Sequence, residues 1–560
     1  MDLLLVLTVL LPLAGSIALA ALAPRLDHTR ARTIALATVL ASLALSLALL
    51  VSFRPGVVTP QFAPKVGNDY GWSWVAMPEG SGIRFALGLD GLSVWLFVLT
   101  TLLMVPSVFA SWESVKERAA THYALMLALE TGLLGLFASL DVVLFYIFFE
   151  FTLIPLFFLI GLYGGPDRRR AAVTFFLYTL AGSLLTLLGV IALVVVSYQH
   201  PLPGAVTRLT FSIPELTDTL SKLATAWPDW GRADSLASPQ VLIFLLLFAG
   251  FAIKVPLFPF HTWLPLAHVE APTAGSILLA GVLLKVGGYG LLRFNMGMAP
   301  LGAQYLFPML ATIAVVGILY GALTALAQSD IKKLVAYSSV SHMGFVALGI
   351  FAANRTAMEG AVIQMVNHGL TTGALFACVG VIYERYHTRE MARMSGLWDR
   401  LPLLAFFFIL ASLGSAAVPG LNGFVGEFPI LAGMFARSRT AAVLSAVGMI
   451  LGAYYLLWML QRVVFGPLRE PAEHDGHDAS HGHAPVRSVG WHEIAGLTPL
   501  MALIVLIGVY PRPIFDSIQR PVAAIVSNAN KTKTGDVASR PEPAPASQIA
   551  ENLPQQDRAR

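Results

Sequence analysis

Long apolar runs separated by short polar connections dominate the pattern of the chain. Fourteen runs are long enough to cross a lipid bilayer, which takes about 20 apolar residues in a helix. An even number of crossings places both ends of the chain on one side of the membrane. The pattern therefore predicts an all-α polytopic membrane protein. The predicted spans cover about 1–23, 33–53, 88–110, 121–139, 141–163, 171–198, 240–265, 270–293, 304–327, 331–352, 358–383, 401–436, 440–465 and 491–512.

Composition supports this class. Of the 560 residues 56% are hydrophobic and 12% are charged, whereas soluble proteins carry roughly 25% charged residues. A water-soluble enzyme of this size could not bury so much apolar surface and is excluded. The net charge of +4 is typical of a membrane protein with basic inner loops and does not indicate nucleic-acid binding. The single cysteine, Cys378, cannot form an internal disulfide, an iron–sulfur site or a zinc site.

Basic residues predict the orientation. The first run begins with Asp2 and contains no Lys or Arg, while Arg25, Arg30 and Arg32 follow it. This charge order is the reverse of that in a cleaved secretory signal, so we interpret the run as the first span. With the N-terminus outside, the Lys-rich and Arg-rich loops all fall on the inside. Both termini are therefore expected on the periplasmic side of a bacterial inner membrane.

Outside the spans, one inner loop and the C-terminal segment have distinctive compositions. The loop 466–490 holds four histidines, and we favour a solvated loop over a metal site. The segment from 513 is rich in polar residues and proline, which predicts a disordered tail. The resulting division is 1–120 (first three spans and an outer loop), 121–293 (first half), 304–465 (second half), 466–490 (His-rich loop), 491–512 (last span) and 513–560 (tail).

Two short motifs repeat five spans apart. Gly250-Phe is followed by Lys254 and Pro256, and Gly423-Phe is followed at the same spacing by Glu427 and Pro429. An odd offset means that the copies cross the membrane in opposite directions, which predicts two inverted five-helix repeats. Because proline breaks the helical hydrogen-bond ladder, we expect helices 7 and 12 to be discontinuous at these motifs.

Ionisable residues in the middle of predicted spans indicate the chemistry. A charge at the bilayer centre costs about 2.5–3.5 kcal/mol on insertion scales. For any single residue a structural ion pair is an alternative, but the whole set favours a hydrated path for protons. A sodium site would need several oxygen ligands at one point, and no such carboxylate cluster occurs. The residues are Glu130, Glu150, Lys254, Lys285, Glu427, His342 and His368.

The segment 251–294 resembles the proton-conducting antiporter module of respiratory complex I and the Mrp-type antiporters. Its sequence, FAIKVPLFPFHTWLPLAHVEAPTAGSILLAGVLLKVGGYGLLRF, includes His261, His268 and Lys285. The resemblance extends over about 85–465. Glu427 is decisive within this family, since sibling subunits and antiporters usually carry lysine there. The chain is thus most similar to the subunit M branch, the counterpart of mitochondrial ND subunit four.

The resemblance implies specific roles. Glu150 and Lys254 would form an ion pair, Lys285 would be the central proton carrier, and His342 and His368 would link it to Glu427. It also implies that NADH, FMN, iron–sulfur clusters and quinone belong to other subunits, that this chain binds no cofactor or metal, and that its partners are neighbouring antiporter-like subunits. A subunit of a Na⁺/H⁺ antiporter and a non-conducting scaffold are the competing interpretations.

Overall fold

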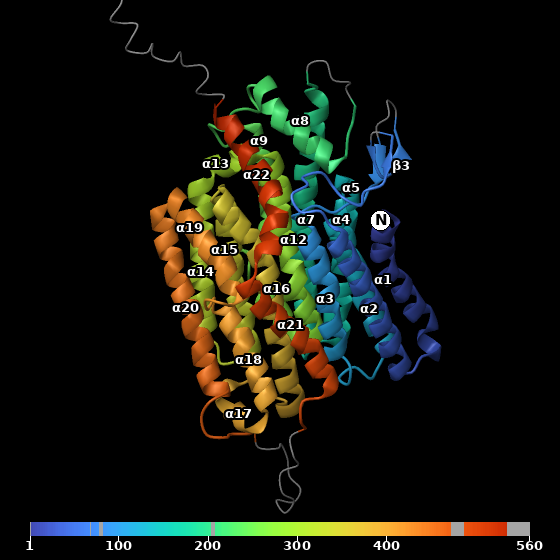
Figure 1. The fold of residues 1–560 in the computed structure, drawn as a ribbon, viewed down its shortest axis with the longest axis vertical. Coiled ribbons are helices and arrows are strands. Elements are labelled where there is room, and N and C mark those ends of the chain that lie inside the picture. The colour runs from blue at the N-terminus through green and yellow to red at the C-terminus, as the bar shows by residue number, and fades with distance from the viewer. Residues whose placement is uncertain (1, 68, 78–81, 203–207, 472–486, 535–560) are drawn as a thin grey trace, which may run out of the picture.

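The computed structural model describes residues 2–67, 69–77, 82–202, 208–471 and 487–534. Most of them belong to helices that run along the long axis of one bundle (Figure 1). The four histidines of the loop 466–490 and residues 535–560 lie outside the described parts.

Residues 2–296 form the first group of elements, which includes the helices that carry Lys254 and Lys285. They are α1 (Asp2–Leu22), η1 (Ala23–Arg25), α2 (His28–Ser52), β1 (Lys65–Val66), β2 (Asp69–Tyr70), β3 (Trp72–Ala76), β4 (Gly82–Phe85), α3 (Val94–Ala110), α4 (Ala119–Ala138), α5 (Val142–Phe151), α6 (Leu153–Tyr163), α7 (Arg168–Gln199), α8 (Ile213–Ala226), α9 (Pro239–Lys254), α10 (Trp263–Glu270), α11 (Thr273–Leu278), the π-helical η3 (Leu279–Leu283), α12 (Leu284–Gly290) and the π-helical η4 (Leu291–Met296).

The remaining elements complete the bundle. They are α13 (Pro300–Tyr305), α14 (Phe307–Leu326), α15 (Ile331–Phe351), α16 (Arg355–Tyr386), η5 (Met391–Arg393), α17 (Leu397–Arg400), α18 (Pro402–Ser415), α19 (Asn422–Arg437), α20 (Arg439–Val463), α21 (Trp491–Val509) and α22 (Arg512–Thr534).

Helix ends follow local side-chain chemistry. Asp27, Asp141 and Asp330 each accept hydrogen bonds from backbone N–H groups of the first turn of α2, α5 and α15. These N–H groups have no partner within the helix, so a carboxylate there stabilises the helix start. The strands are minor: β1 pairs antiparallel with β2 and β3 with β4, with Trp72 opposite Phe85.

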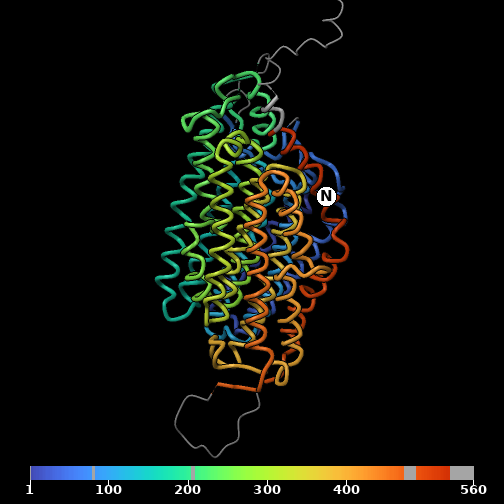
Figure 2. The backbone as a smooth tube through the Cα atoms, turned by 90° about the vertical axis from the view of Figure 1, so that its left-hand side faces the viewer, coloured from blue at the N-terminus to red at the C-terminus, as the bar shows by residue number. Residues whose placement is uncertain are grey.

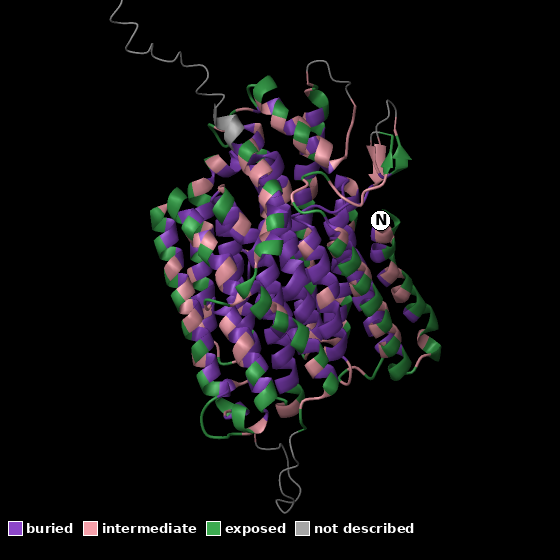
Figure 3. Ribbon diagram, in the orientation of Figure 1, coloured by how far each residue is buried: buried purple, intermediate pink, exposed green. Residues whose placement is uncertain are grey.

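The structure is all-α and polytopic in character, as the apolar runs predict. Among the described residues, eleven helical stretches are long and apolar enough to cross a membrane, and α3, α9 and α18 are shorter apolar helices. Each overlaps one predicted run. Figure 2 shows these helices side by side from a second direction, and Figure 3 shows the buried residues concentrated in the middle of the bundle.

The seventh predicted span (about 240–265), called helix 7 here and distinct from the element α7, is interrupted at the predicted motif. The helix α9 ends at Lys254 and α10 begins at Trp263, so Pro256 lies in the irregular connection. The Ala252 carbonyl, which proline leaves without its helical partner, accepts a hydrogen bond from the Leu257 N–H at 2.9 Å. The Trp263 indole donates to the Ile253 carbonyl at 3.0 Å and ties the two half-helices together.

The twelfth predicted span (about 401–436), called helix 12 here and distinct from the element α12, is also interrupted, but not at Pro429. That proline lies inside α19, and the interruption falls between Ser415 and Asn422. Pro419-Gly420 supplies the turn, with Gly420 at a φ of 89° that favours glycine. The expectation that Pro429 breaks the helix was therefore wrong. The inverted relationship of the two halves stays a prediction.

The segment after the last span also differs from expectation. Residues 512–534 form the helix α22 rather than a disordered tail. Ile514, Ile518, Val522 and Ile525 are buried and lie three or four residues apart, so they form one apolar face. This face packs against α16, α13 and α8 (Figure 1).

Candidate functional site

Four helices bring four of the predicted residues together in the middle of the bundle. Lys285 lies on α12 between the two π-helical segments, and its ammonium nitrogen is 2.7 Å from Nδ1 of His368 on α16. The Lys285 ammonium also donates a hydrogen bond to the Ala280 carbonyl. Both side chains are buried, so this contact joins two groups that can each hold or release a proton.

A second contact continues the series. Nδ1 of His342 on α15 lies 2.6 Å from Oε1 of Glu427 on α19, and the Gln364 amide donates to the same oxygen at 2.9 Å. The rings of His342 and His368 have centroids 5.8 Å apart. The order Lys285–His368–His342–Glu427 is here named the central chain.

Two further side chains contact the central chain and escaped prediction. Nε2 of His342 lies 3.2 Å from both the Ser415 hydroxyl and the Tyr455 hydroxyl. Ser415 is the last residue of α18, at the interruption of helix 12, and the Pro-Gly turn that follows it is the signal that could have indicated it. Tyr455 is one of two adjacent tyrosines in an apolar helix, and nothing in the sequence distinguishes it from Tyr454.

Close packing of backbone fixes the Glu427 end of the central chain. A Cβ atom added at Gly426 would lie 2.1 Å from Oε1 of Gln364, and one at Gly423 would lie 2.1 Å from the Gly414 carbonyl oxygen. Side chains larger than hydrogen do not fit at either position without movement of α16 or α18. These glycines allow α19 to approach the helices that carry Gln364 and Gly414.

The first half of the bundle holds its charges differently. The Lys254 ammonium is buried, has no hydrogen-bond partner, and lies 4.4 Å from the ring centroid of Phe149. In the described chain Lys254 and Glu150 form no hydrogen bond with each other but interact electrostatically, and their role as an ion pair stays a prediction. Because the Phe149 ring faces the ammonium, the close contact of Lys254 is a cation–π contact.

Glu130, His261 and His268 also lie apart from the central chain. Glu130 on α4 is fully buried, and neither of its carboxylate oxygens has a partner. His268 on α10 stacks on the Phe376 ring at 4.5 Å, and both of its ring nitrogens lack a partner. His261 lies against the ring of Tyr320 at 5.0 Å. The structure therefore joins four of the predicted residues and leaves the others separate.

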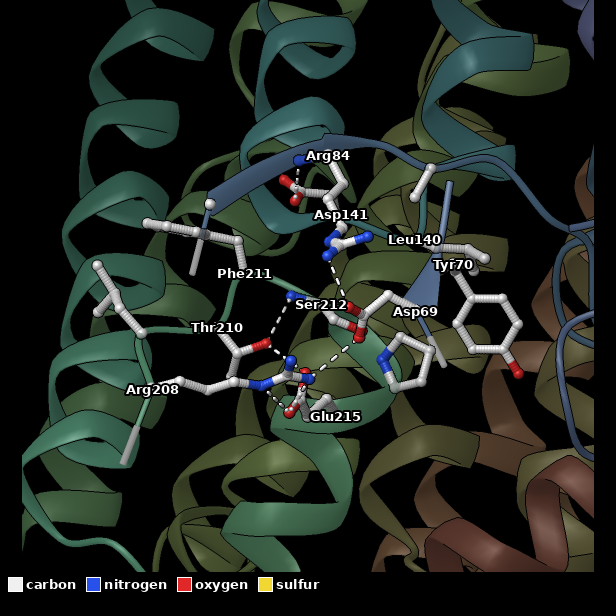
Figure 4. A pocket seen from close by; sticks show the side chains of 14 residues that line it. Asp69, Tyr70, Arg84, Leu140, Asp141, Arg208, Thr210, Phe211, Ser212 and Glu215 are labelled. Atoms are coloured by element: carbon white, nitrogen blue, oxygen red, sulfur yellow. Dashed lines mark hydrogen bonds and ion pairs between the residues drawn. The ribbon is translucent and has the colours of Figure 1, made fainter. Parts of the chain in front are cut away.

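A polar pocket of about 290 Å³ lies at the end of the bundle that carries α8 and the strands. Asp69 lies between two arginines, 2.6 Å from Arg84 and 3.1 Å from Arg208 (Figure 4). Glu215 binds Arg208 at 2.7 Å. These ion pairs join the strand region to the segment before α8.

Asp141 lines this pocket one residue before the span that starts at Val142. Its carboxylate accepts hydrogen bonds from the backbone N–H groups of Arg84, Val143 and Leu144. Burial raises the pKa of Asp141 to about 6, against the lowering effect of these hydrogen bonds. The charged side chains of this pocket therefore form ion pairs and hydrogen bonds with one another and with the backbone. In the described residues no cluster of three or more His, Cys, Asp or Glu side chains could hold a metal ion.

Comparison with known proteins identifies relatives over most of the chain. The family model described as "NADH:quinone oxidoreductase/Mrp antiporter, TM" matches residues 139–452. NADH-quinone oxidoreductase subunit M of Rhodobacter capsulatus is 41% identical over 522 residues, covering 92% of this chain and 95% of the relative. NADH-ubiquinone oxidoreductase chain 4 of Prototheca wickerhamii is 38% identical over 515 residues, covering 91% and 92%.

Solved structures give the same result. A chain of respiratory complex I from Thermus thermophilus with bound NADH has a TM-score of 0.76 and 31% identity, with coverage of 94% of this chain and 99% of that chain. A chain of the Mrp complex from Dietzia sp. DQ12-45-1b has a TM-score of 0.72 and 25% identity, covering 93% of this chain and 52% of that chain.

Proposed function

The chain belongs to the NADH:quinone oxidoreductase/Mrp antiporter family of membrane subunits, and from this premise we propose that its buried Glu, Lys and His side chains carry protons across the membrane in a complex I of the subunit M type. The enzyme class of the assembly would be a proton-translocating NADH:quinone oxidoreductase. The central chain is the observation that carries the proposal, since it connects four protonatable groups across four helices.

Each link of the central chain suits proton transfer in a different way. At 2.7 Å, the Lys285 ammonium can pass a proton to an unprotonated Nδ1 of His368. At 2.6 Å, His342 and Glu427 can exchange one directly. The two imidazoles are farther apart, and Nε2 of His368 has no protein partner. We place a bridging water in this gap, which makes it the step most sensitive to hydration.

Glu150, Lys254 and Glu130 act by their charge in this proposal. They lie within the first half, buried or half-buried, and no direct hydrogen bond joins them to the central chain. A change of protonation at any of them alters the electric field at Lys285, because a low-dielectric interior screens charges weakly. This assigns them to the control of transfer and the central chain to transfer itself.

Redox chemistry is assigned to other subunits. NADH oxidation, FMN, iron–sulfur clusters and quinone reduction would all lie outside this chain, and adjacent antiporter-like subunits would be its membrane partners. The relatives that carry the name of subunit M or chain 4 support this assignment. The distribution of Lys and Arg supports a bacterial inner membrane with both termini periplasmic.

The test is NADH-driven proton uptake by the purified complex in liposomes, measured together with quinone reduction. Proton uptake that is abolished by Lys285→Met and is independent of sodium supports the proposal. Sodium-dependent proton movement without NADH would favour the Mrp-type antiporter, to which the chain is also similar. Wild-type pumping by Lys285→Met and Glu427→Gln together would leave this subunit as a scaffold.

A further inference from the structure

The carboxyl end of α10 is held by side chains from several separate elements. This half-helix follows the interruption of helix 7 and carries Trp263 and His268. The last carbonyl groups of a helix have no partner within it, and Pro272 has no N–H with which to satisfy one. The backbone oxygens at this end are nevertheless all bonded.

Each of these oxygens accepts at least one hydrogen bond, and Lys332 donates to two of them. The Val269 carbonyl accepts from Arg389 at 2.7 Å and from Lys332 at 3.5 Å, and the Ala271 carbonyl accepts from Lys332 at 2.6 Å. The His268 carbonyl accepts from the Ser276 hydroxyl at 3.2 Å, the Glu270 carbonyl from the Gly165 N–H at 2.9 Å, and the Ala267 carbonyl from the Ala271 N–H at 2.8 Å.

Two cations thus meet the negative end of the helix dipole. Lys332 is buried in the first turn of α15, and Arg389 lies in the connection after α16, where it also pairs with Asp330 at 3.6 Å. Positive charge near a helix carboxyl end is stabilising, more so where water is excluded. No carboxylate lies within 4.0 Å of the Lys332 ammonium in the described chain.

We propose that Lys332, with Arg389, is a positioning residue that clamps the carboxyl end of α10 onto α15, and so fixes the broken helix 7 relative to the central chain. This inference rests on the proposed function. The acceptors of the Lys332 ammonium are backbone carbonyls, which take hydrogen bonds but no proton. Lys332 therefore holds the half-helix and is not itself a carrier.

The experiment compares three variants in the assembled complex. Lys332→Met removes the donors, and Lys332→Arg keeps them but cannot release a proton. Lys333→Met is the matched control, since Lys333 is the next residue and is exposed. Amide hydrogen exchange over residues 263–271 is measured beside the number of protons pumped per NADH.

For Lys332→Met we expect exchange in this segment to become about tenfold faster, as for the loss of one hydrogen bond to a charged group, and fewer protons per NADH. Lys332→Arg should restore both values, and Lys333→Met should leave both unchanged. If Lys332→Met does not assemble, Arg389→Gln removes the guanidinium that donates to the Val269 carbonyl and gives the same exchange test over residues 263–271.

Several outcomes would overturn the clamp. A Lys332→Arg variant as defective in pumping as Lys332→Met would make Lys332 a proton carrier. Unchanged exchange in Lys332→Met, or faster exchange with normal pumping, would also reject it. Lys285→Met in the same series tests the proposed function separately, because normal pumping by that variant rejects the central chain whatever the exchange data show.

Discussion

The predicted mid-span groups are bonded differently in the two halves of the bundle. In the first half, Glu130 and Lys254 have no hydrogen-bond partner, and one oxygen of Glu150 has none. In the second half, His342 and Glu427 bond each other and further polar groups. Lys285 stands at the junction, since it lies in the first half and contacts His368 of the second. Isolated charges suit control by electric field, whereas bonded groups suit transfer.

The position of the helix interruption explains part of the difference. In helix 7 the ionisable residue comes last before the interruption, and in helix 12 it comes after the interruption, inside α19. Glu427 therefore lies on a continuous helix that packs closely on α16. The same short motif produces a bonded carboxylate in one copy and an unbonded ammonium in the other.

The largest effect is expected at the junction. Lys285→Met should assemble, because methionine keeps the unbranched apolar stem, and should lose proton transport almost completely. Lys285→Arg should also be poor, because the guanidinium does not deprotonate in proteins. Proton uptake by the reconstituted complex measures both, and normal pumping by the Arg variant would exclude proton release from this side chain.

Glu427 tests the bonded half. Glu427→Gln keeps size and hydrogen bonding but cannot titrate, so it should lose most of the pumping. Glu427→Asp keeps the acid on a shorter arm and should lose less, on the order of 2 kcal/mol in the barrier if one hydrogen bond to a charged group is broken. Proton uptake and NADH turnover are measured side by side. Equal pumping by Gln and wild type would make Glu427 a structural anchor.

Glu150 and Lys254 test the unbonded half. Glu150→Ala and Lys254→Ala should each lower pumping, by less than Lys285→Met. Since no hydrogen bond joins them, we expect a coupling of about 1 kcal/mol or less in a double-mutant cycle on pumping rates, whereas removing one partner of a contacting buried pair costs about 3–5 kcal/mol. A larger coupling would mean that the two groups meet during turnover.

The smallest effect on pumping is expected at Asp141, on the rim of the first half, where the change is one of stability. A carboxyl whose pKa is raised to about 6 in the fold stabilises the protein most below its ordinary value of 3.8, and this contribution is lost as pH rises through 6. Asp141→Asn keeps the helix cap and stays neutral. Its gain over wild type should be about 3 kcal/mol at most at pH 7.5 and should fall below about 1 kcal/mol near pH 4. Thermal unfolding of the purified complex at both pH values measures it, and a pH-independent difference would contradict this account.

Most of the fold could be predicted from the sequence. A membrane-spanning backbone must satisfy its own hydrogen bonds, so apolar runs of sufficient length become helices. The amphipathic helix α22 was missed because its polar composition hides the spacing of its four buried isoleucine and valine residues. The turn at Pro419-Gly420 was missed because it lies inside one long apolar run.

The site was predictable as a set of residues and not as a set of contacts. Ionisable residues in apolar runs stand out by their cost, which is why Lys285 and Glu427 could be selected. Which of them touch depends on how helices rotate against each other. That rotation places Phe149 rather than a carboxylate against Lys254 and brings Tyr455 to His342.

The close approach at Gly426 has a consequence for how this protein can change over generations. Every replacement there adds atoms where Gln364 already lies 2.1 Å from the site of a new Cβ. Any residue larger than glycine at this position therefore pushes α19 away from α16, and so separates Glu427 from its amide donor, Gln364. The Cβ and Cα atoms of Gln364 also lie 2.8 and 3.0 Å from that site, so a change of residue 364 alone does not make room and a helix must move as well.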